Sequence, residues 1–300
     1  MALAEPSRLH APLEGGREGA TVVVHPLVCA WVQAPPEMFV KQYGLLRSVT
    51  RMLRGPRPDW VPLPITAFFL EHPSVGPIII DTGLHASVGV DPKQSFGSFL
   101  GRMYRGIEMK PDQTVAAQVR ARGVAPRDVK VAIMTHLHLD HASAISDFTE
   151  ATYVLGQGEW AAFHSRAPAL QGYVRKHVAH AVEYREVVYG DRTIDSYSTF
   201  GRSFDLFGDG SVRLVYTPGH TPGHQSVIVR LKGREALLAG DAIYYVDTLD
   251  HERRPLFLAD EHNWRRSLRE IQLYRRENPD ALIIPCHDGD LWKRIEKRYD

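Results

Sequence analysis

The sequence has 300 residues, 44% of them hydrophobic and 24% charged, with a formal net charge of +1. This balance is ordinary for a globular protein and excludes the strongly basic field of a nucleic-acid-binding chain. The one local cluster of arginines lies on a predicted helix with Glu270 and Glu277 interspersed. We interpret it as a solvated helix face and expect no nucleic-acid partner.

The cysteine count and the hydrophobic pattern bear on the compartment. Cys29 and Cys286 are the only cysteines and stand in apolar runs, which is typical of buried thiols in a reducing compartment. Residues 1–20 lack the apolar core of a secretory signal, and the longest apolar stretch, Thr21–Val32, is too short to cross a bilayer. We therefore expect a cytoplasmic protein without a membrane partner, and a flexible N-terminal tail over residues 1–20.

The first half of the chain predicts strands with two helices. Residues 21–32 are rich in β-branched side chains and predict a strand, and residues 36–54 have apolar side chains at helical spacing. Ile65–His72 and Pro77–Asp81 predict a hairpin around a Pro-Ser-Val-Gly turn. A helix is predicted over 111–122, and a short buried strand over Lys130–Met134.

The second half predicts a second group of strands. Thr152–Leu155 predicts a strand, and residues 159–182 a helical insert interrupted near Pro168 and Gly172. A helix is predicted over about 262–277, followed by the strand Ala281–Pro285 and a short C-terminal helix. Further strands are predicted at 184–189, 203–207, 212–216, 225–231 and 235–239. Two packed β-sheets with helices outside satisfy this order, so we expect an α/β fold in one domain over residues 21–300.

One short motif carries the clearest chemical signal. Residues 135–141 read Thr-His-Leu-His-Leu-Asp-His, directly after an apolar strand. In an extended segment His136 and His138 point to the same side, because side chains alternate with a period of two. Asp140 and His141 then fall in the following turn, where they can face a second centre.

Three more strands deliver histidine or aspartate at their ends. His220 ends a Thr-Pro-Gly-His turn, Asp241 follows Gly240, and His287 follows Pro285-Cys286. Imidazole nitrogen and carboxylate oxygen are ligands of zinc and similar divalent metals. Seven such ligands are too many for one tetrahedral ion and suit two ions that share a bridging carboxylate.

The motif HLHLDH followed by His220, Asp241 and His287 resembles the metallo-β-lactamase superfamily over nearly the whole chain. The resemblance implies an αββα sandwich with two packed mixed β-sheets and helices on the outer faces. It also implies that His136, His138 and His220 bind the first metal ion, and that Asp140, His141 and His287 bind the second. Asp241 would then bridge the two ions.

Among the branches of the superfamily, the N-acyl-homoserine lactonases of the quorum-quenching branch are the most similar. The segments that carry this resemblance are GPIIIDTG from Gly76, residues 113–142, TPGHTPGHQS from Thr217, and DAIY from Asp241. True zinc β-lactamases have a cysteine at the position of Asp241. The helical domain of glyoxalase II, the flavodoxin domain of flavin-linked diiron relatives and the RNA-binding arm of transfer-RNA-processing relatives are not expected here.

The lactonase resemblance implies a reaction and leaves alternatives open. A metal-bridging hydroxide would open the lactone ring, with Tyr244 stabilising the oxyanion and Asp140 relaying the proton to the leaving alkoxide. The two ions are expected to be zinc, although iron, manganese and cobalt suit the same ligands. The alternatives are a glyoxalase II-like thioesterase, another ester hydrolase of the superfamily, or a non-catalytic binding protein. A small lactone or ester is the expected partner, and a homodimer is possible.

Where the sequence departs from the lactonases, the substrate pocket is affected. Leu139 replaces an aromatic found in some of them, the spacer between His141 and His220 is longer, and residues 36–58 match poorly. In that segment we predict that the acyl chain contacts apolar side chains, namely Met38, Phe39 and Leu45.

Other residues near the motifs have both a functional and a structural interpretation. We expect His224 to support a ligand or fill the core, and one of the pair Tyr244 and Tyr245 to be a core residue. Asp81 could form a turn or a hydrogen bond to a ligand histidine. The histidines of the insert are expected at the surface or the pocket rim: His164, His177 and His180.

Overall fold

The computed structural model describes residues 5–39, 47, 50, 51, 54, 57–104, 106–179 and 183–300. Most of the helix predicted over residues 36–54 lies outside the described residues. In that segment the structure describes the 3-10 turn η1, Pro36–Met38, and residues 47, 50, 51 and 54, which are helical as predicted.

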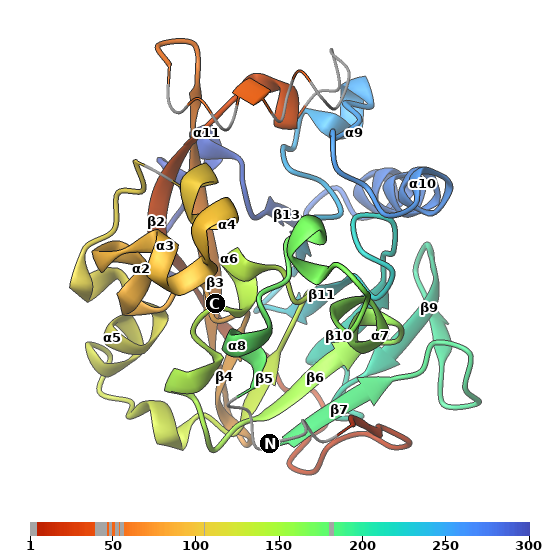
Figure 1. Ribbon diagram of the computed structural model, residues 1–300. Coiled ribbons are helices and arrows are strands. Elements are labelled where there is room, and N and C mark those ends of the chain that lie inside the picture. Colours follow the sequence, from red (N-terminus) through yellow and green to blue (C-terminus); the bar gives the residue numbers. More distant parts are fainter. Residues whose placement is uncertain are drawn as a thin grey trace.

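Two mixed β-sheets form the centre of the described part of the chain (Figure 1). The first sheet has the strand order β1-β7-β6-β5-β4-β3-β2 and is parallel from β1 to β4. Strands β4, β3 and β2 are antiparallel to one another. In that order the strands are Ser7–Arg8, Glu183–Val187, Thr152–Gly156, Val131–Ile133, Gly76–Ile80, Val61–His72 and Val23–Ala34.

The second sheet has the order β13-β12-β11-β10-β9-β8. It is antiparallel except for the pairing of β12 with β13, which aligns Leu237 with Ile283 in parallel. In sheet order the strands are Leu282–Pro285, Glu235–Gly240, Gln225–Arg230, Val212–Tyr216, Phe200–Asp205 and Asp195–Tyr197.

Helices cover both outer faces of the paired sheets. Figure 1 shows α2 to α5 on one side and the 17-residue helix α10 on the other. The α-helices are α2 Ala86–Val90, α3 Pro92–Phe96, α4 Ser98–Met103, α5 Val115–Arg120, α6 Leu139–Ala142, α7 Glu159–Phe163, α8 Arg175–Val178, α9 Thr248–His251, α10 Glu261–Glu277 and α11 Gly289–Trp292. Besides η1, the 3-10 turns are η2 Pro111–Gln113, η3 Pro126–Asp128, η4 Ile145–Asp147 and η5 Pro168–Gln171.

Alternation along the strands builds three hydrophobic cores. In β3, Phe68 and Leu70 point into the core between the sheets, whereas Phe69 points to the helices of the first face. In β12, Leu238 lies between the sheets and Leu237 packs toward α10. Each sheet is therefore apolar on both faces, as an inner layer must be. The expected αββα sandwich is confirmed.

Most strands agree with the sequence prediction, and the differences have physical reasons. The predicted hairpin is confirmed as β3 and β4, and its turn is closed by His72, whose Nδ1 accepts hydrogen bonds from the backbone of Ser74 and Val75. Helices α2 to α4 were not predicted, because glycine and proline interrupt the apolar pattern over residues 86–103. The helical insert is three short elements, α7, η5 and α8.

The flexible tail over residues 1–20 stays a prediction, and within residues 5–20 the structure shows contacts of residues 7–9 with the rest of the fold. Ser7–Arg8 pairs in parallel with β7, and the side chain of Leu9 is buried. Leu9 joins the core between the sheets, which explains why this polar stretch is held. Among the described residues, no helix combines the length and apolar character needed to cross a membrane.

Candidate metal centre

Strand ends bring the predicted ligands together from both sheets. His136, His138, Asp140 and His141 follow β5 of the first sheet. The other three follow the ends of second-sheet strands: His220 after β10, Asp241 after β12 and His287 after β13. The structure thus gathers all seven predicted residues at one edge of the sandwich.

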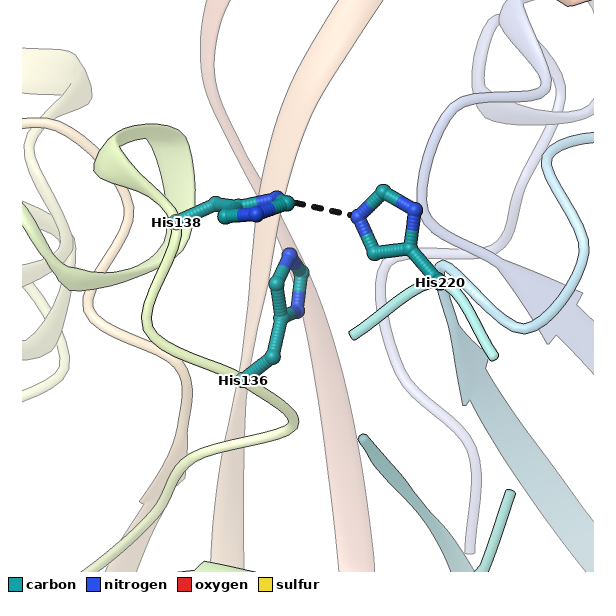
Figure 2. Close-up of side chains that lie close together, drawn as sticks. All are labelled: His136, His138 and His220. Atoms are coloured by element: carbon teal, nitrogen blue, oxygen red, sulfur yellow. Dashed lines mark hydrogen bonds between the residues drawn. The ribbon is translucent and has the colours of Figure 1, made fainter. Parts of the chain in front are cut away.

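The first set of ligands consists of His136, His138 and His220. One nitrogen of each ring lies within 4.8 Å of the others. Figure 2 shows the three rings converging from two loops, with Nε2 of His220 3.0 Å from Nδ1 of His138. The two nitrogens share a hydrogen bond, and a cation between the rings would take the place of its proton.

The second set consists of Asp140, His141 and His287, whose ligand atoms also lie within 4.8 Å of one another. Asp241 faces both sets with different oxygens. Its Oδ2 lies 3.3 Å from Nε2 of His220, and its Oδ1 lies 3.1 Å from Nε2 of His287 and 3.4 Å from Nε2 of His141. One carboxylate therefore stands between the two sets, as a bridging ligand must.

Buried polar atoms that lack a hydrogen-bond partner indicate whether these residues fit metal ions. Nε2 of His136, Nε2 of His141 and Oδ1 of Asp241 are buried and have no hydrogen-bond partner. A buried polar atom without a partner costs free energy, so a native structure satisfies it by another means. All three atoms point into the space between the ligands, and N and O donors are those that divalent cations of the zinc type take. The residues fit two divalent metal ions.

The charge balance differs between the two sets. Burial lowers the pKa of His138 to about 4 and holds the pKa of His136 and His220 well below its usual value. These three rings are neutral at pH 7 and offer lone pairs. Burial also disfavours charge on His141 and His287, but the facing carboxylates, above all Asp241, outweigh it and raise the pKa of both rings. The second set thus lies in the more negatively charged surroundings of the two.

Hydrogen bonds orient the rings of the second set. Nδ1 of His287 donates to the carbonyl of Pro64 at 2.9 Å, which leaves Nε2 facing the centre. Nδ1 of His141 donates to the carboxylate of Asp81 at 2.7 Å. Of the two roles predicted for Asp81, the structure therefore shows the bond to a ligand histidine. Its backbone has φ of 59°, in the left-handed region that aspartate tolerates better than most residues.

His224 supports the bridging residue, as predicted, and lies outside the two ligand sets. Its Nε2 accepts a hydrogen bond of 2.9 Å from the backbone N–H of Asp241. Its Nδ1 lies 2.9 Å from the hydroxyl of Thr217, and the ring is fully buried. The histidine thereby ties the loop that bears His220 to the end of β12.

Helix α10 holds the loop that carries His220. Gly219 has φ of 135°, and a Cβ there would lie 2.3 Å from the backbone nitrogen of Trp264, so only glycine fits. Ser267 donates a hydrogen bond to the carbonyl of Pro218 at 2.8 Å. The close packing fixes the position from which the His220 ring projects.

A buried carboxylate that was not predicted from the sequence lies behind the first ligand set. Glu159, the first residue of α7, is fully buried and accepts four hydrogen bonds. Burial raises the pKa of its carboxyl group, and bonds from Thr221 and Leu137 oppose that change. An acidic residue at the start of a helix is usually a solvated one, so no sequence signal distinguished it.

An apolar cavity of about 420 Å³ opens above the ligands. Tyr244 lines it, with its hydroxyl 3.4 Å from Nδ1 of His220. Burial raises the pKa of this phenol well above its usual value, so it stays protonated. Of the tyrosine pair, Tyr244 belongs to the core, whereas Tyr245 is partly buried and packs against Phe39.

Short elements form the walls of the cavity, and several of their residues were not predicted. Met38 and Phe39 line it, as expected for the acyl-chain contacts, whereas Leu45 lies outside the described residues. Phe99 and Leu170 stand at its rim with 44% and 73% of their surfaces exposed. The wall residues that the sequence analysis missed are Trp60, Leu63, Phe99, Leu100, Tyr104, Leu170 and Phe257.

The two described histidines of the insert, His164 and His177, belong to neither ligand set. His164 bonds to the carbonyl of Trp160 and is exposed, in agreement with the prediction. His177 was expected near the surface, but it is buried, because its Nε2 donates to the carbonyl of Ser95 and its ring packs on Phe96. His180 lies outside the described residues.

Known proteins resemble this chain in both sequence and structure. The model of the Metallo-beta-lactamase superfamily matches residues 60–287. The N-acyl homoserine lactonase AttM of Rhizobium radiobacter is 33% identical over 265 residues, covering 87% of this chain and 96% of the relative. AttM of Azorhizobium caulinodans is 34% identical with the same coverage.

Solved structures share the fold at lower identity. An N-acyl homoserine lactone hydrolase with N-hexanoyl-L-homoserine bound at its catalytic metal center has a TM-score of 0.72 at 20% identity. The match covers 95% of this chain and 98% of that one. The dizinc quorum-quenching lactonase AidC has a TM-score of 0.61 at 12% identity, covering 93% of this chain and 90% of AidC.

Proposed function

Because the chain belongs to the metallo-beta-lactamase superfamily, we propose that it is a metal-dependent hydrolase that opens the lactone ring of N-acyl homoserine lactones. The curated relatives that match most of its length bear that activity in their names. The observation that carries the proposal is the position of Asp241, which presents one oxygen to each ligand set below an apolar cavity.

The seven residues at the strand ends would hold the metal ions. His136, His138 and His220 would bind one ion, Asp140, His141 and His287 the other, and Asp241 both. When bound, the two ions would lower the pKa of water and polarise the lactone carbonyl. The nitrogen-rich ligands favour zinc, and mass spectrometry of the metals in purified protein tests this choice.

Tyr244 would supply a hydrogen bond to the carbonyl oxygen of the lactone. With Nε2 of His220 directed at Asp241, its Nδ1 carries the ring proton and faces the phenol oxygen. The phenolic proton is then free to point into the cavity. A protonated donor in a buried site stabilises the negative charge that develops on the oxygen during ring opening.

Asp140 would receive and return the proton of the reaction. Its Oδ2 faces the second set, 3.8 Å from Nε2 of His287, and its side chain lines the cavity. The other carboxylate oxygen is available to take a proton from the attacking water and pass it to the ring oxygen as the ester bond breaks. The product is then an N-acyl homoserine.

A substrate panel tests this function. Metal-loaded protein is assayed with N-acyl homoserine lactones of several chain lengths, an acyl-glutathione thioester and a phosphodiester. We expect ring opening of the lactones to be the fastest reaction. Cleavage of the thioester without any reaction of the lactones would establish the thioesterase alternative, and binding of a partner without turnover would establish a non-catalytic protein.

Two further expectations concern the compartment and the assembly. Both cysteines are free and buried, which supports a reducing, cytoplasmic compartment. Localisation of a tagged protein tests this. The homodimer stays a prediction, and light scattering after size-exclusion chromatography measures the mass of the particle.

A further inference from the structure

The buried carboxylate of Glu159 is the most heavily hydrogen-bonded acidic side chain near the centre. Its Oε1 accepts from the backbone N–H of Leu137 at 2.9 Å and from the hydroxyl of Tyr173 at 3.0 Å. Its Oε2 accepts from the hydroxyl of Thr221 at 2.6 Å and from the backbone N–H of Gly223 at 3.2 Å. The side chain is fully buried, so these four donors replace water completely.

Three of the four donors belong to the segments that carry the first ligand set, and the fourth, Tyr173, packs against one of its rings. Leu137 stands between His136 and His138, and Thr221 directly follows His220. The ring of Tyr173 packs edge-on against the ring of His138, with the ring centres 4.9 Å apart. One carboxylate thus joins the two loops whose rings converge in Figure 2.

We propose that Glu159 is a positioning residue that holds these two loops at the separation the first metal ion requires. The inference rests on the proposed function, because it assumes that His136, His138 and His220 bind metal. Glu159 does not touch the ion or the substrate. It acts through the backbone on either side of the ligands, as supporting residues of metal sites do.

The supports of the second ligand set do not include Glu159, although one of them, Asp81, also accepts hydrogen bonds from the backbone N–H and the hydroxyl of Thr135, beside His136. His141 is oriented by Asp81, and His287 by the carbonyl of Pro64. The four hydrogen bonds that Glu159 accepts do not involve these residues or their immediate neighbours. Loss of Glu159 should therefore weaken binding at the first set and leave the second set nearly unchanged.

The substitution Glu159→Gln is a sharp test because each carboxylate oxygen accepts from one backbone N–H. In either orientation the amide NH₂ group replaces one oxygen, and it then faces the N–H of Leu137 or that of Gly223. Hydroxyl groups can rotate to become acceptors, but a backbone N–H cannot. One of the two loops must shift, although the side chain keeps its size and shape.

The experiment titrates metal-free protein with Zn²⁺ in competition with a chelating dye, which yields two stepwise binding constants. The variants His220→Ala and His287→Ala identify which step belongs to which set. For Glu159→Gln we expect the affinity of the first set to fall by about 10- to 100-fold. The affinity of the second set should stay within about twofold of wild type, since its supports are intact. The absorption spectrum of the Co²⁺ form should change at the same step.

A matched control is Glu186→Gln. The carboxylate of Glu186 accepts a hydrogen bond of 3.1 Å from the backbone N–H of Gly158, at the start of the same helix. This hydrogen bond does not involve either ligand loop. We expect both binding constants to match the wild type. If Glu159→Gln does not fold, as judged by circular dichroism, Tyr173→Phe decides, and we expect a loss of severalfold at the first set.

The outcomes separate this inference from the proposed function. Wild-type protein that binds two ions, with a Glu159→Gln variant that binds both equally well or loses both equally, overturns the role of Glu159 alone. An equal loss in Glu186→Gln does the same. Wild-type protein that binds no metal overturns the proposed function, and the role of Glu159 with it.

Discussion

The floor and the walls of the cavity are built in opposite ways. The floor consists of the seven predicted ligand residues, which are held at strand ends by directional hydrogen bonds. Its members include His136, fully buried, and Asp241, 3% exposed. The walls are apolar side chains from short elements, such as Phe99 and Leu170, at 44% and 73% exposure. Apolar contacts have no required direction, so walls can change while the floor keeps its geometry. The chemistry and the choice of substrate should therefore be separable by mutation.

The largest effect should come from the centre of the floor. Asp241→Asn leaves one oxygen where two are needed, because Oδ1 and Oδ2 face different ligand sets. We expect metal content to fall and kcat/KM for the lactone to drop on the order of 10³-fold, several kcal/mol of activation free energy. Mass spectrometry measures the metal content, and a lactonase assay measures kcat/KM. Asp290→Asn, with a side chain 88% exposed, is the control and should behave as wild type. A fully active Asp241→Asn protein would contradict the shared-carboxylate arrangement.

Removing the metal should destabilise the floor as a whole. Three buried nitrogen and oxygen atoms of the floor, which would bind the metal ions, have no hydrogen-bond partner. A ligand present at a hundredfold excess over its Kd contributes about 2.7 kcal/mol to the free energy of unfolding. For a chain of this size that corresponds to a decrease in Tm of about 4 °C on adding a chelator. Differential scanning fluorimetry measures the change, and Zn²⁺ should reverse it. A Tm that does not respond to chelator would show that the site folds equally well without metal.

Tyr244 stands between floor and walls, and its loss should affect the rate alone. Tyr244→Phe removes the hydroxyl that lies 3.4 Å from His220 but keeps the ring. Loss of one hydrogen-bond donor to the oxyanion should slow lactone opening by about tenfold, near the low end for such sites because metal ions share the charge. Metal content should not change. Tyr245→Phe, whose ring packs against Phe39, should have no effect. A large loss of metal in Tyr244→Phe would move the tyrosine from the reaction to the support of His220.

The smallest effect should come from the rim of the walls. Phe99→Ala and Leu170→Ala truncate exposed side chains that line the cavity. We expect each to lower kcat/KM for a decanoyl lactone severalfold, because about 1 kcal/mol of apolar contact with the acyl chain is lost. A butanoyl lactone should react as before, and metal content should be unchanged. Val90→Ala is the control, since Val90 is 85% exposed and does not line the cavity. Equal losses with both lactones would place the rim outside the acyl-binding surface.

The sequence predicted the floor better than the walls for a physical reason. Each ligand follows an apolar strand, so strand periodicity and residue type together located it. The walls come from residues 86–103 and similar segments, where Gly97 and Gly101 interrupt the pattern and tertiary packing decides the structure. Glu159 could not be predicted because nothing in its neighbourhood distinguishes a buried carboxylate from a solvated one. Leu9 was missed because a single apolar residue in a polar stretch gave no periodic signal, although the core between the sheets holds it.

The pairing of β12 with β13 determines when during folding the second metal ion can be bound. This parallel pairing aligns Leu237 with Ile283, and it brings His287 to the end of the strand that precedes Asp241. The HLHLDH motif is synthesised long before His287, and the second ligand set is complete only when this non-local pair has formed. Contacts between distant parts of a chain form slowly in folding. We therefore expect uptake of the second ion to be among the last events of folding, so that Co²⁺ absorbance reports the final step of refolding rather than the collapse of the core.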